Sequence, residues 1–291
     1  MTPYVSLLLL LLLGLSQAQP VKEEGSKAVD EEAPVDISTR ILSSNNGSKQ
    51  ILLEGDLVAP KSRNAMKCWS QSCLWPKGSN GLVVIPYTIS NVYDGWERQI
   101  IENAMQSFHS TTCIRFVPRT NEYDYIMVEN GDGCYSSLGK EGYGQVLSIN
   151  RQGCVYYGVV QHEIMHALGF QHEQTRSDRD YYVRINWENI YSDMAFNFYL
   201  QDTNNLNTPY DYGSIMHYGR TAFSMYNGVE TITPIPDPHI DWPKGRHVLL
   251  GHPEGQSALW LLKTKFSSNT NEIMSPPLIL LNYDMFTIKL L

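Results

Sequence analysis

In the middle of the chain, the spacing of apolar residues is typical of β-strands in some segments and of an α-helix in another. Residues 81–87 (GLVVIPY) are almost continuously apolar, which predicts a buried strand. Three shorter β-branched and aromatic runs, at residues 113–117, 125–129 and 146–149, are further strand candidates. Residues 97–108 carry apolar side chains at helical spacing, which predicts a helix with one buried side (Ile100, Ile101, Ala104, Met105 and Phe108).

A second helix is expected over about residues 158–168, after the last strand candidate. Strands and helices mixed in this order predict an α+β or α/β lobe in which the second helix packs against the sheet. The segment after Gln171 is rich in Asn, Asp, Tyr and Pro, so a second lobe with little regular structure is expected there.

The first residues of the chain have the pattern of a secretory signal peptide. Residues 6–15 form a leucine-rich core, and Ser16-Gln17-Ala18 follows it, which predicts a signal peptide over residues 1–18. The alternative is a membrane anchor, for which this apolar run is short.

The next segment has the composition of a propeptide. Residues 20–63 are acidic and polar, have little to bury, and are expected to lack a core of their own. They end in Lys61-Ser62-Arg63, which supplies a basic cleavage point, so an activating protease is expected to cut after Arg63 and release residues 19–63. Asn46-Gly47-Ser48 is a glycosylation acceptor by sequence, which fits a surface segment.

Charge and cysteine content narrow the class of protein. The formal net charge is −8, which gives no indication of a nucleic-acid partner. Secretion would place the five cysteines in an oxidising compartment, where disulfides are expected. Because five is an odd number, one cysteine is left over.

Residues 162–172 (HEIMHALGFQH) place three histidines and one glutamate in the pattern HExxHxxGxxH. On a helix, His162 and His166 project from one face, one turn apart, so both can bind one ion. Glu163 lies beside that face, where its carboxylate can take a proton from water activated by the metal. Gly169 allows the chain to leave the helix and bring His172 in as a third ligand.

Three protein ligands leave one coordination position open, which a catalytic zinc needs and a structural zinc lacks. The alternative is that the histidines have purely structural roles. The fixed offsets of Gly169 and His172 argue against it, as does a second motif at residues 214–218 (SIMHY), a methionine turn of the kind expected beneath such a site.

The sequence HEIMHALGFQHEQTR at residues 162–176, together with SIMHY at residues 214–218, resembles the astacin family of metzincin endopeptidases. The likeness extends over about residues 64–238 and includes CIRFVPRT at residues 113–120. Several segments look like the fish hatching enzymes of this family, which digest the egg envelope (residues 64–73, 148–154, 176–190 and 202–212).

The resemblance implies a fold and a set of catalytic roles. The fold would be an α+β, two-lobed metzincin domain over residues 64–240, with a twisted mixed sheet, a backing helix and an active-site helix over a mostly irregular C-terminal lobe. One zinc ion would be held by the three histidines of the motif (His162, His166 and His172). Glu163 would act as general base and then as acid to the leaving amine. Tyr218 would ligate zinc at rest and swing to stabilise the tetrahedral oxyanion; a packed aromatic is the alternative.

Three further residues take roles from the resemblance. Met216 would form an apolar floor beneath the site, and Glu173 would engage the N-terminus of the mature enzyme. Asp56, in the propeptide motif Leu53-Glu54-Gly55-Asp56, would coordinate the zinc and displace the catalytic water, which would keep the zymogen inactive. The alternative for Asp56 is a turn aspartate after glycine.

The resemblance also pairs Cys134 with Cys154 and Cys68 with Cys73, and leaves Cys113 over. In the family the partner of this last cysteine lies at the extreme C-terminus, whereas here the family pattern stops from His239 onward. Codons read one base out of frame from Asp241 permit a family-like C-terminus that contains the missing cysteine. Residues 241–291 are therefore interpreted as a frameshifted tail, and a natural divergent tail is the alternative.

The sequence thus predicts a secreted, extracellular zinc endopeptidase that is made as a zymogen. Storage in secretory granules is compatible with this prediction. Its expected substrates are extracellular proteins, above all those of an egg envelope, and neither nucleic acid nor a membrane anchor is expected. The main alternative is a catalytically impaired, zinc-containing extracellular binding protein. A metal-dependent hydrolase of non-peptide esters would share the zinc ligands but would not explain the propeptide or the methionine turn.

Overall fold

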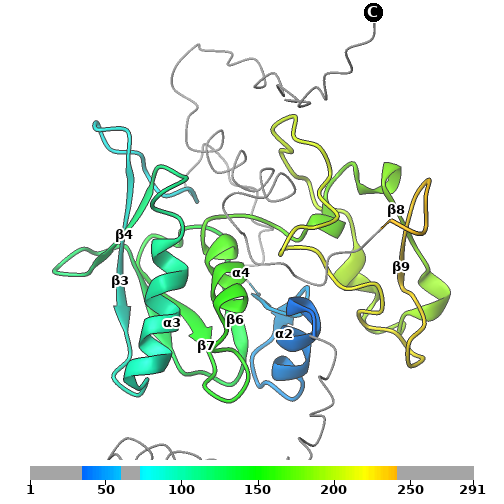
Figure 1. Cartoon of the computed structure of the whole chain (residues 1–291), viewed down its shortest axis with the longest axis horizontal. Helices are drawn as coiled ribbons and strands as arrows, with labels where there is room; N and C mark the ends of the chain where they lie inside the picture. Colours follow the sequence, from blue (N-terminus) through cyan, green and yellow to red (C-terminus); the bar gives the residue numbers. More distant parts are fainter. Residues whose placement is uncertain (1–34, 60–72, 241–291) are drawn as a thin grey trace, which may run out of the picture. The chain divides into compact units, whose positions relative to one another are not determined.

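The computed structural model of the chain describes residues 35–59 and 73–240. All of these residues belong to the unit that begins at Val35. The predicted signal peptide, the cleavage site after Arg63 and the tail from residue 241 lie outside the described residues. The described part has an α+β fold, as predicted, with a mixed sheet followed by a segment that has few regular elements (Figure 1).

Seven strands of the described part form one mixed sheet in the order β1-β2-β6-β7-β5-β3-β4. The four strands predicted from the apolar runs are parallel neighbours in it: β7 (Gly144–Ile149), β5 (Tyr125–Glu129), β3 (Val83–Ile89) and β4 (Ile114–Pro118). β6 (Cys134–Ser136) runs antiparallel to β7. The apolar pattern does not predict β6, because three residues are too few to show an alternating period.

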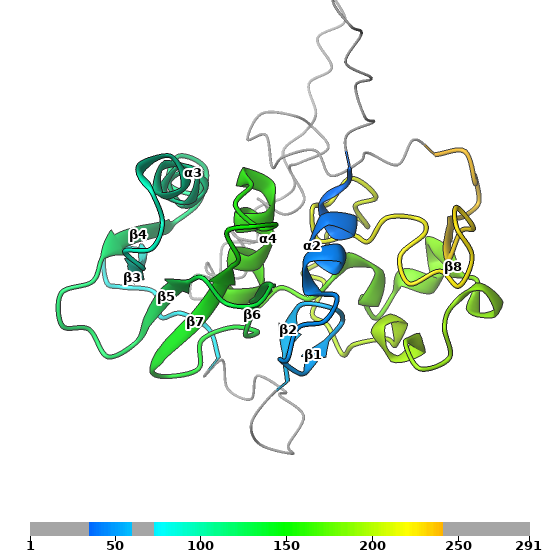
Figure 2. The same ribbon diagram turned by 90° about the horizontal axis from the view of Figure 1, so that it is seen from below.

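Two helices, α3 (Gly95–Gln106) and α4 (Tyr157–Ala167), lie on one face of this sheet and contact each other (Figure 2). A capping box fixes where α3 begins: Asp94 accepts from the backbone of its first turn, and Glu97 accepts from the Asp94 backbone. Every residue of α4 after Tyr157 is buried. The helix therefore places its histidines in the interior of the molecule.

The predicted propeptide contains an element that its composition did not suggest, the helix α2 (Ile37–Asn45). Ile41 of α2 is fully buried in the main core with α4 and the sheet. The next residue, Leu42, packs against a second cluster formed by the C-terminal part of the chain. Figure 2 shows α2 between α4 and the segment that carries β8. The segment is thus ordered by packing on two other cores.

A short hairpin follows α2 and extends the sheet. Its strands are β1 (Leu52–Leu53) and β2 (Leu57–Val58), and β2 pairs in parallel with β6. The turn between them holds Glu54 at φ +49° and Gly55 at φ +81°, a conformation that suits glycine because it has no Cβ. The turn delivers Asp56 to the interior, where it is 1% exposed.

The described residues after α4 are mostly irregular, as predicted. They include a two-stranded sheet of β8 (Val183–Ile185) and β9 (Ile232–Pro234). Four short 3-10 helices accompany it (Glu173–Thr175, Arg179–Tyr181, Trp187–Asn189 and Ala195–Phe198). Its own apolar cluster gives this part the character of a second lobe (Val183, Ile185, Ile190, Phe198, Tyr210, Tyr218, Ala222 and Ile232).

The cysteine pattern agrees with the expected pairing where the structure describes it. A disulfide joins Cys134 in β6 to Cys154, just before α4, with the Cα atoms 5.5 Å apart. Cys73 is disulfide-bonded, and Cys68, its predicted partner, lies outside the described residues. Cys113 is a free, half-buried thiol, and burial raises its pKa.

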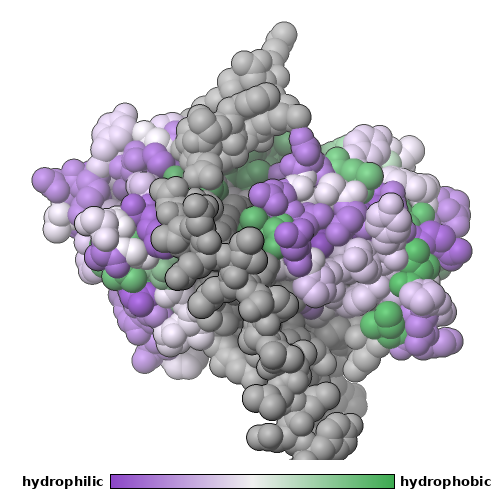
Figure 3. All heavy atoms as spheres, turned by 90° about the horizontal axis from the view of Figure 1, so that it is seen from above, coloured by the Kyte–Doolittle hydropathy of each residue, from purple (hydrophilic) through white to green (hydrophobic). Residues whose placement is uncertain are grey.

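Where described residues are visible in Figure 3, the surface is mostly hydrophilic, with apolar residues in small separate patches. Large apolar side chains that are exposed include Trp96 and Tyr181, at 71% and 81% of their surface. Among the described helices, none combines the length and the apolar character needed to cross a membrane.

Candidate metal centre

Three fully buried imidazoles meet where α4 ends. His162 and His166 lie one turn apart on α4, with ring centroids 4.8 Å apart. The chain leaves the helix at Gly169, whose φ of +92° is the left-handed conformation expected of a glycine there. The turn brings the His172 ring to 5.2 Å from that of His162 and 4.6 Å from that of His166.

Each ring has a hydrogen-bond acceptor at Nδ1. The acceptor is a main-chain carbonyl in two cases and a carboxylate in the third (His162 to Ile215 O at 2.7 Å, His166 to Phe170 O at 2.8 Å, His172 to Glu54 Oε2 at 2.9 Å). Because carbonyl and carboxylate oxygens only accept, Nδ1 donates in all three of these hydrogen bonds. Nε2 is then the nitrogen of each ring that can ligate a metal, once it carries no proton.

Asp56 brings a carboxylate to the three Nε2 atoms. Its Oδ2 lies 3.0 Å from His162 Nε2 and 3.3 Å from His172 Nε2, and its Oδ1 lies 3.3 Å from His166 Nε2. Ligand atoms at about 2.0–2.1 Å from a tetrahedral zinc ion lie about 3.3 Å from one another. The four side chains therefore have the spacing of ligands around one ion.

Unpaired atoms in this cluster test whether it fits a metal. His166 Nε2 and Asp56 Oδ1 are buried without a hydrogen-bond partner among the described residues, which costs free energy unless another group satisfies them. A cation between them would satisfy both. Three imidazole nitrogens and one carboxylate oxygen are donors that zinc accepts, and here all four lie within 4.8 Å of one another. The residues fit a zinc ion.

The electrostatics of the cluster also favour a cation. Burial opposes the charge on Asp56, but the imidazoles of His172 and His166 outweigh it and lower the pKa of Asp56 well below its usual value. Burial lowers the pKa of His166 to about 4. It acts in the same direction on His172, but the carboxylates of Asp56 and Glu54 raise the pKa of that ring to about 9. Carboxylate charge thus dominates a site that is closed to solvent.

The carboxylate of Glu163 is not used in the described part of the structure, which suits a group that exchanges protons. Its side chain is fully buried next to His162, and both carboxylate oxygens have no hydrogen-bond partner among the described residues. Burial raises the pKa of Glu163 well above its usual value, and the nearby charge of Asp56 adds to the increase. A carboxylate without a structural partner is free to exchange protons with a reacting group.

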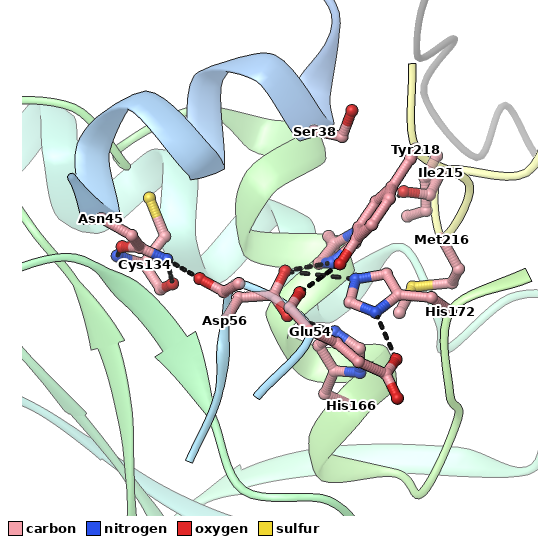
Figure 4. A network of polar contacts seen from close by, with 12 residues as sticks. Ser38, Asn45, Glu54, Asp56, Cys134, His166, His172, Ile215, Met216 and Tyr218 are labelled. Atoms are coloured by element: carbon pink, nitrogen blue, oxygen red, sulfur yellow. Dashed lines mark hydrogen bonds and ion pairs between the residues drawn. The ribbon is translucent and has the colours of Figure 1, made fainter. Parts of the chain in front are cut away.

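Tyr218 and Met216 come from the methionine turn and lie beside the imidazoles (Figure 4). The Tyr218 ring is 4.7 Å from that of His172, and its hydroxyl donates a hydrogen bond to the main-chain carbonyl of Glu54. Met216 is 2% exposed and belongs to the main core. The turn is also tied to α4, because Ile215 supplies the acceptor for His162.

Glu173 follows the third histidine and is bound within the second lobe. Its carboxylate accepts hydrogen bonds from Arg176 Nη1 and from the main-chain N–H of Asp211, both at 2.9 Å. Burial raises its pKa to about 7. The predicted contact of Glu173 with the mature N-terminus would involve residues near Arg63, which lie outside the described part of the chain.

One residue of the centre was not predicted from sequence. Glu54 is 3% exposed, contacts His172 through its side chain and Tyr218 through its backbone, and so belongs to the site together with Asp56 (Figure 4). Its place in the motif around Asp56 was the only sequence feature that could have indicated this. The contact with His172 joins residues 118 positions apart.

Comparisons with known proteins agree with this centre. The family model described as Astacin, a family of peptidases, matches residues 70–243. The chain is 63% identical to high choriolytic enzyme 1 of Oryzias latipes over 245 residues, covering 82% of this chain and 91% of that one. It is 55% identical to the low choriolytic enzyme of the same fish, covering 80% and 89%. Among solved structures, high choriolytic enzyme 1 matches with a TM-score of 0.64 at 58% identity, over 70% of this chain and 99% of that one.

Proposed function

This chain belongs to the astacin family of peptidases and is a zinc metalloendopeptidase, and we propose that its substrates are the structural proteins of an egg envelope. The observation that carries the proposal is the similarity to two choriolytic enzymes over more than four-fifths of their length. It is supported by a buried centre in which three imidazoles, a free glutamate and a tyrosine converge.

The proposed ligands of the zinc ion are the three Nε2 atoms of the motif (His162, His166 and His172). When bound there, zinc supplies a Lewis acid that polarises the scissile carbonyl and makes water a better nucleophile. Glu163 then takes a proton from the attacking water and delivers it to the leaving amine. The Tyr218 hydroxyl is proposed to donate to the oxyanion of the tetrahedral intermediate.

Residues 19–63 are proposed to keep this centre inactive. Asp56 occupies the position next to all three Nε2 atoms, and the Tyr218 hydroxyl donates a hydrogen bond to the main-chain carbonyl of Glu54. The turn that carries Glu54 and Asp56 thus binds the Tyr218 hydroxyl, which should stabilise the oxyanion. It also fills the position that substrate should reach. Cleavage after Arg63 by an activating protease would release the turn, provided that the segment dissociates.

The remaining assignments along the chain are also proposals. Residues 1–18 would be a signal peptide for secretion, residues 64–240 the peptidase domain, and residues 241–291 a frameshifted tail. The free thiol of Cys113 supports the last assignment, since the family's partner cysteine belongs to the C-terminus that the frameshift would replace.

Purified fish egg envelopes provide the test of the proposed substrate. The processed enzyme is expected to release soluble peptides from isolated envelopes, and processed Glu163→Gln protein is expected to release none above background. Casein serves as the comparison substrate. Efficient cleavage of casein with intact envelopes would contradict the proposed substrate, and equal background levels on both substrates would favour the zinc-containing binding protein.

A further inference from the structure

Glu54 uses both carboxylate oxygens inside the metal centre. Oε2 accepts a hydrogen bond from His172 Nδ1 at 2.9 Å, and Oε1 accepts one from Gln201 Nε2, also at 2.9 Å. The residue is 3% exposed and adopts φ +49°, a conformation that non-glycine residues rarely adopt. A buried carboxylate in an unfavourable backbone conformation needs such partners to persist.

The acceptor at His172 differs in origin from the other two. His162 and His166 donate to main-chain carbonyls at Ile215 and Phe170, within the peptidase domain, and these acceptors remain after the propeptide has gone. His172 donates to a side chain of the propeptide. One of the three imidazoles therefore depends for its orientation on a group that activation removes.

We propose that Glu54 is a positioning residue for the metal, present only in the uncut chain, that makes the zymogen hold zinc more tightly. A carboxylate that accepts from Nδ1 fixes the ring, secures the tautomer with a lone pair on Nε2, and makes that nitrogen a stronger ligand. The inference rests on the proposed function, in which His162, His166, His172 and Asp56 surround the ion.

Glu54 and Asp56 act from the same turn but in different ways. Asp56 places an oxygen among the ligand atoms, whereas Glu54 acts through His172 and lies on the far side of that ring. Because both belong to the propeptide, one cut would remove a direct ligand and the support of a second ligand together. Zinc affinity should therefore fall on activation by more than the loss of Asp56 alone explains.

The test measures zinc affinity of the uncut chain by competition with a chromogenic chelator, with chain length checked by mass spectrometry. Glu54→Ala is expected to bind zinc about 10–100-fold more weakly than wild type, the usual cost of removing such a partner. Glu54→Gln keeps an oxygen acceptor and should lose less. Gln201→Ala leaves the bond to His172 intact and should lose the least.

Two controls distinguish failure of the inference on Glu54 from failure of the proposed function. After the propeptide has been removed, all Glu54 variants have the same sequence, so their zinc affinities should become equal and lie below that of uncut wild type. A difference that persists after cutting would overturn the inference, because it could not arise from the contact between Glu54 and His172. So would a folded, uncut Glu54→Ala chain that binds zinc as tightly as wild type. Uncut wild type without zinc would instead contradict the proposed function.

Discussion

Replacing Glu163 by Gln is expected to lower kcat/KM of the processed enzyme by roughly 10²–10⁴-fold, the range that general acid–base catalysis supplies. Gln has nearly the same size and shape but cannot accept the proton of the attacking water. Because Glu163 has no hydrogen-bond partner among the described residues, the change should leave both the fold and the zinc content unaltered. Peptide hydrolysis and zinc content of the same preparation provide the measurement.

Glu188→Gln is the matched control, since Glu188 is an exposed carboxylate in the second lobe, and it should retain full activity. Comparable rates for Glu163→Gln and wild type would show that another group moves the proton. Loss of zinc together with activity in Glu163→Gln would mean that this carboxylate supports the metal site instead.

Replacing Asp56 by Ala should make the uncut chain hydrolyse a short fluorogenic peptide that uncut wild type leaves intact. The carboxylate contacts three buried imidazoles, and removing one partner of such a buried contact costs about 3–5 kcal/mol. A free energy of that size corresponds to an increase of roughly 10²-fold or more in the fraction of uncut chains whose metal centre is accessible to substrate. Large protein substrates should be cleaved less, because α2 and the β1–β2 hairpin still pack on the domain.

The control for this experiment is Asp132→Asn. Asp132 is exposed and accepts a hydrogen bond from the main-chain N–H of Lys49 in the proposed propeptide, so it helps to dock that segment away from the metal centre. It should leave the uncut chain inactive. Adding Glu163→Gln to Asp56→Ala should abolish the new activity. An uncut Asp56→Ala chain that stays silent would contradict the role of Asp56 in latency.

The features predicted correctly from sequence are those that depend on the spacing of residues close together in the chain. The apolar runs of β3, β4, β5 and β7 and the helical spacing in α4 each specify an element within a few residues. The turn at Gly169 is equally local, because a residue without Cβ marks the point where the chain leaves α4. The three buried histidines of α4 and the following turn could therefore be placed together before the fold was known.

The segment proposed as a propeptide shows where prediction from sequence ends. Its helix α2 is mostly polar, and Ile41 and Leu42 become informative only once two separate cores are there to receive them. The same holds for Glu54, whose partners His172 and Gln201 lie 118 and 147 residues away. Contacts between residues so far apart in the sequence depend on how the elements pack in three dimensions. The periodicity of a single sequence does not predict that packing.

Three imidazoles of the HExxHxxGxxH motif are proposed to hold one catalytic zinc ion. The most direct test measures zinc by mass spectrometry in processed wild type and in processed His166→Ala, alongside peptide hydrolysis before and after chelation. Wild type should contain equimolar zinc, lose activity on chelation and recover it when zinc is restored, whereas His166→Ala should lack both zinc and activity. Processed wild type that contains no zinc, or that hydrolyses peptides undiminished after complete chelation, would contradict the proposed catalytic zinc site.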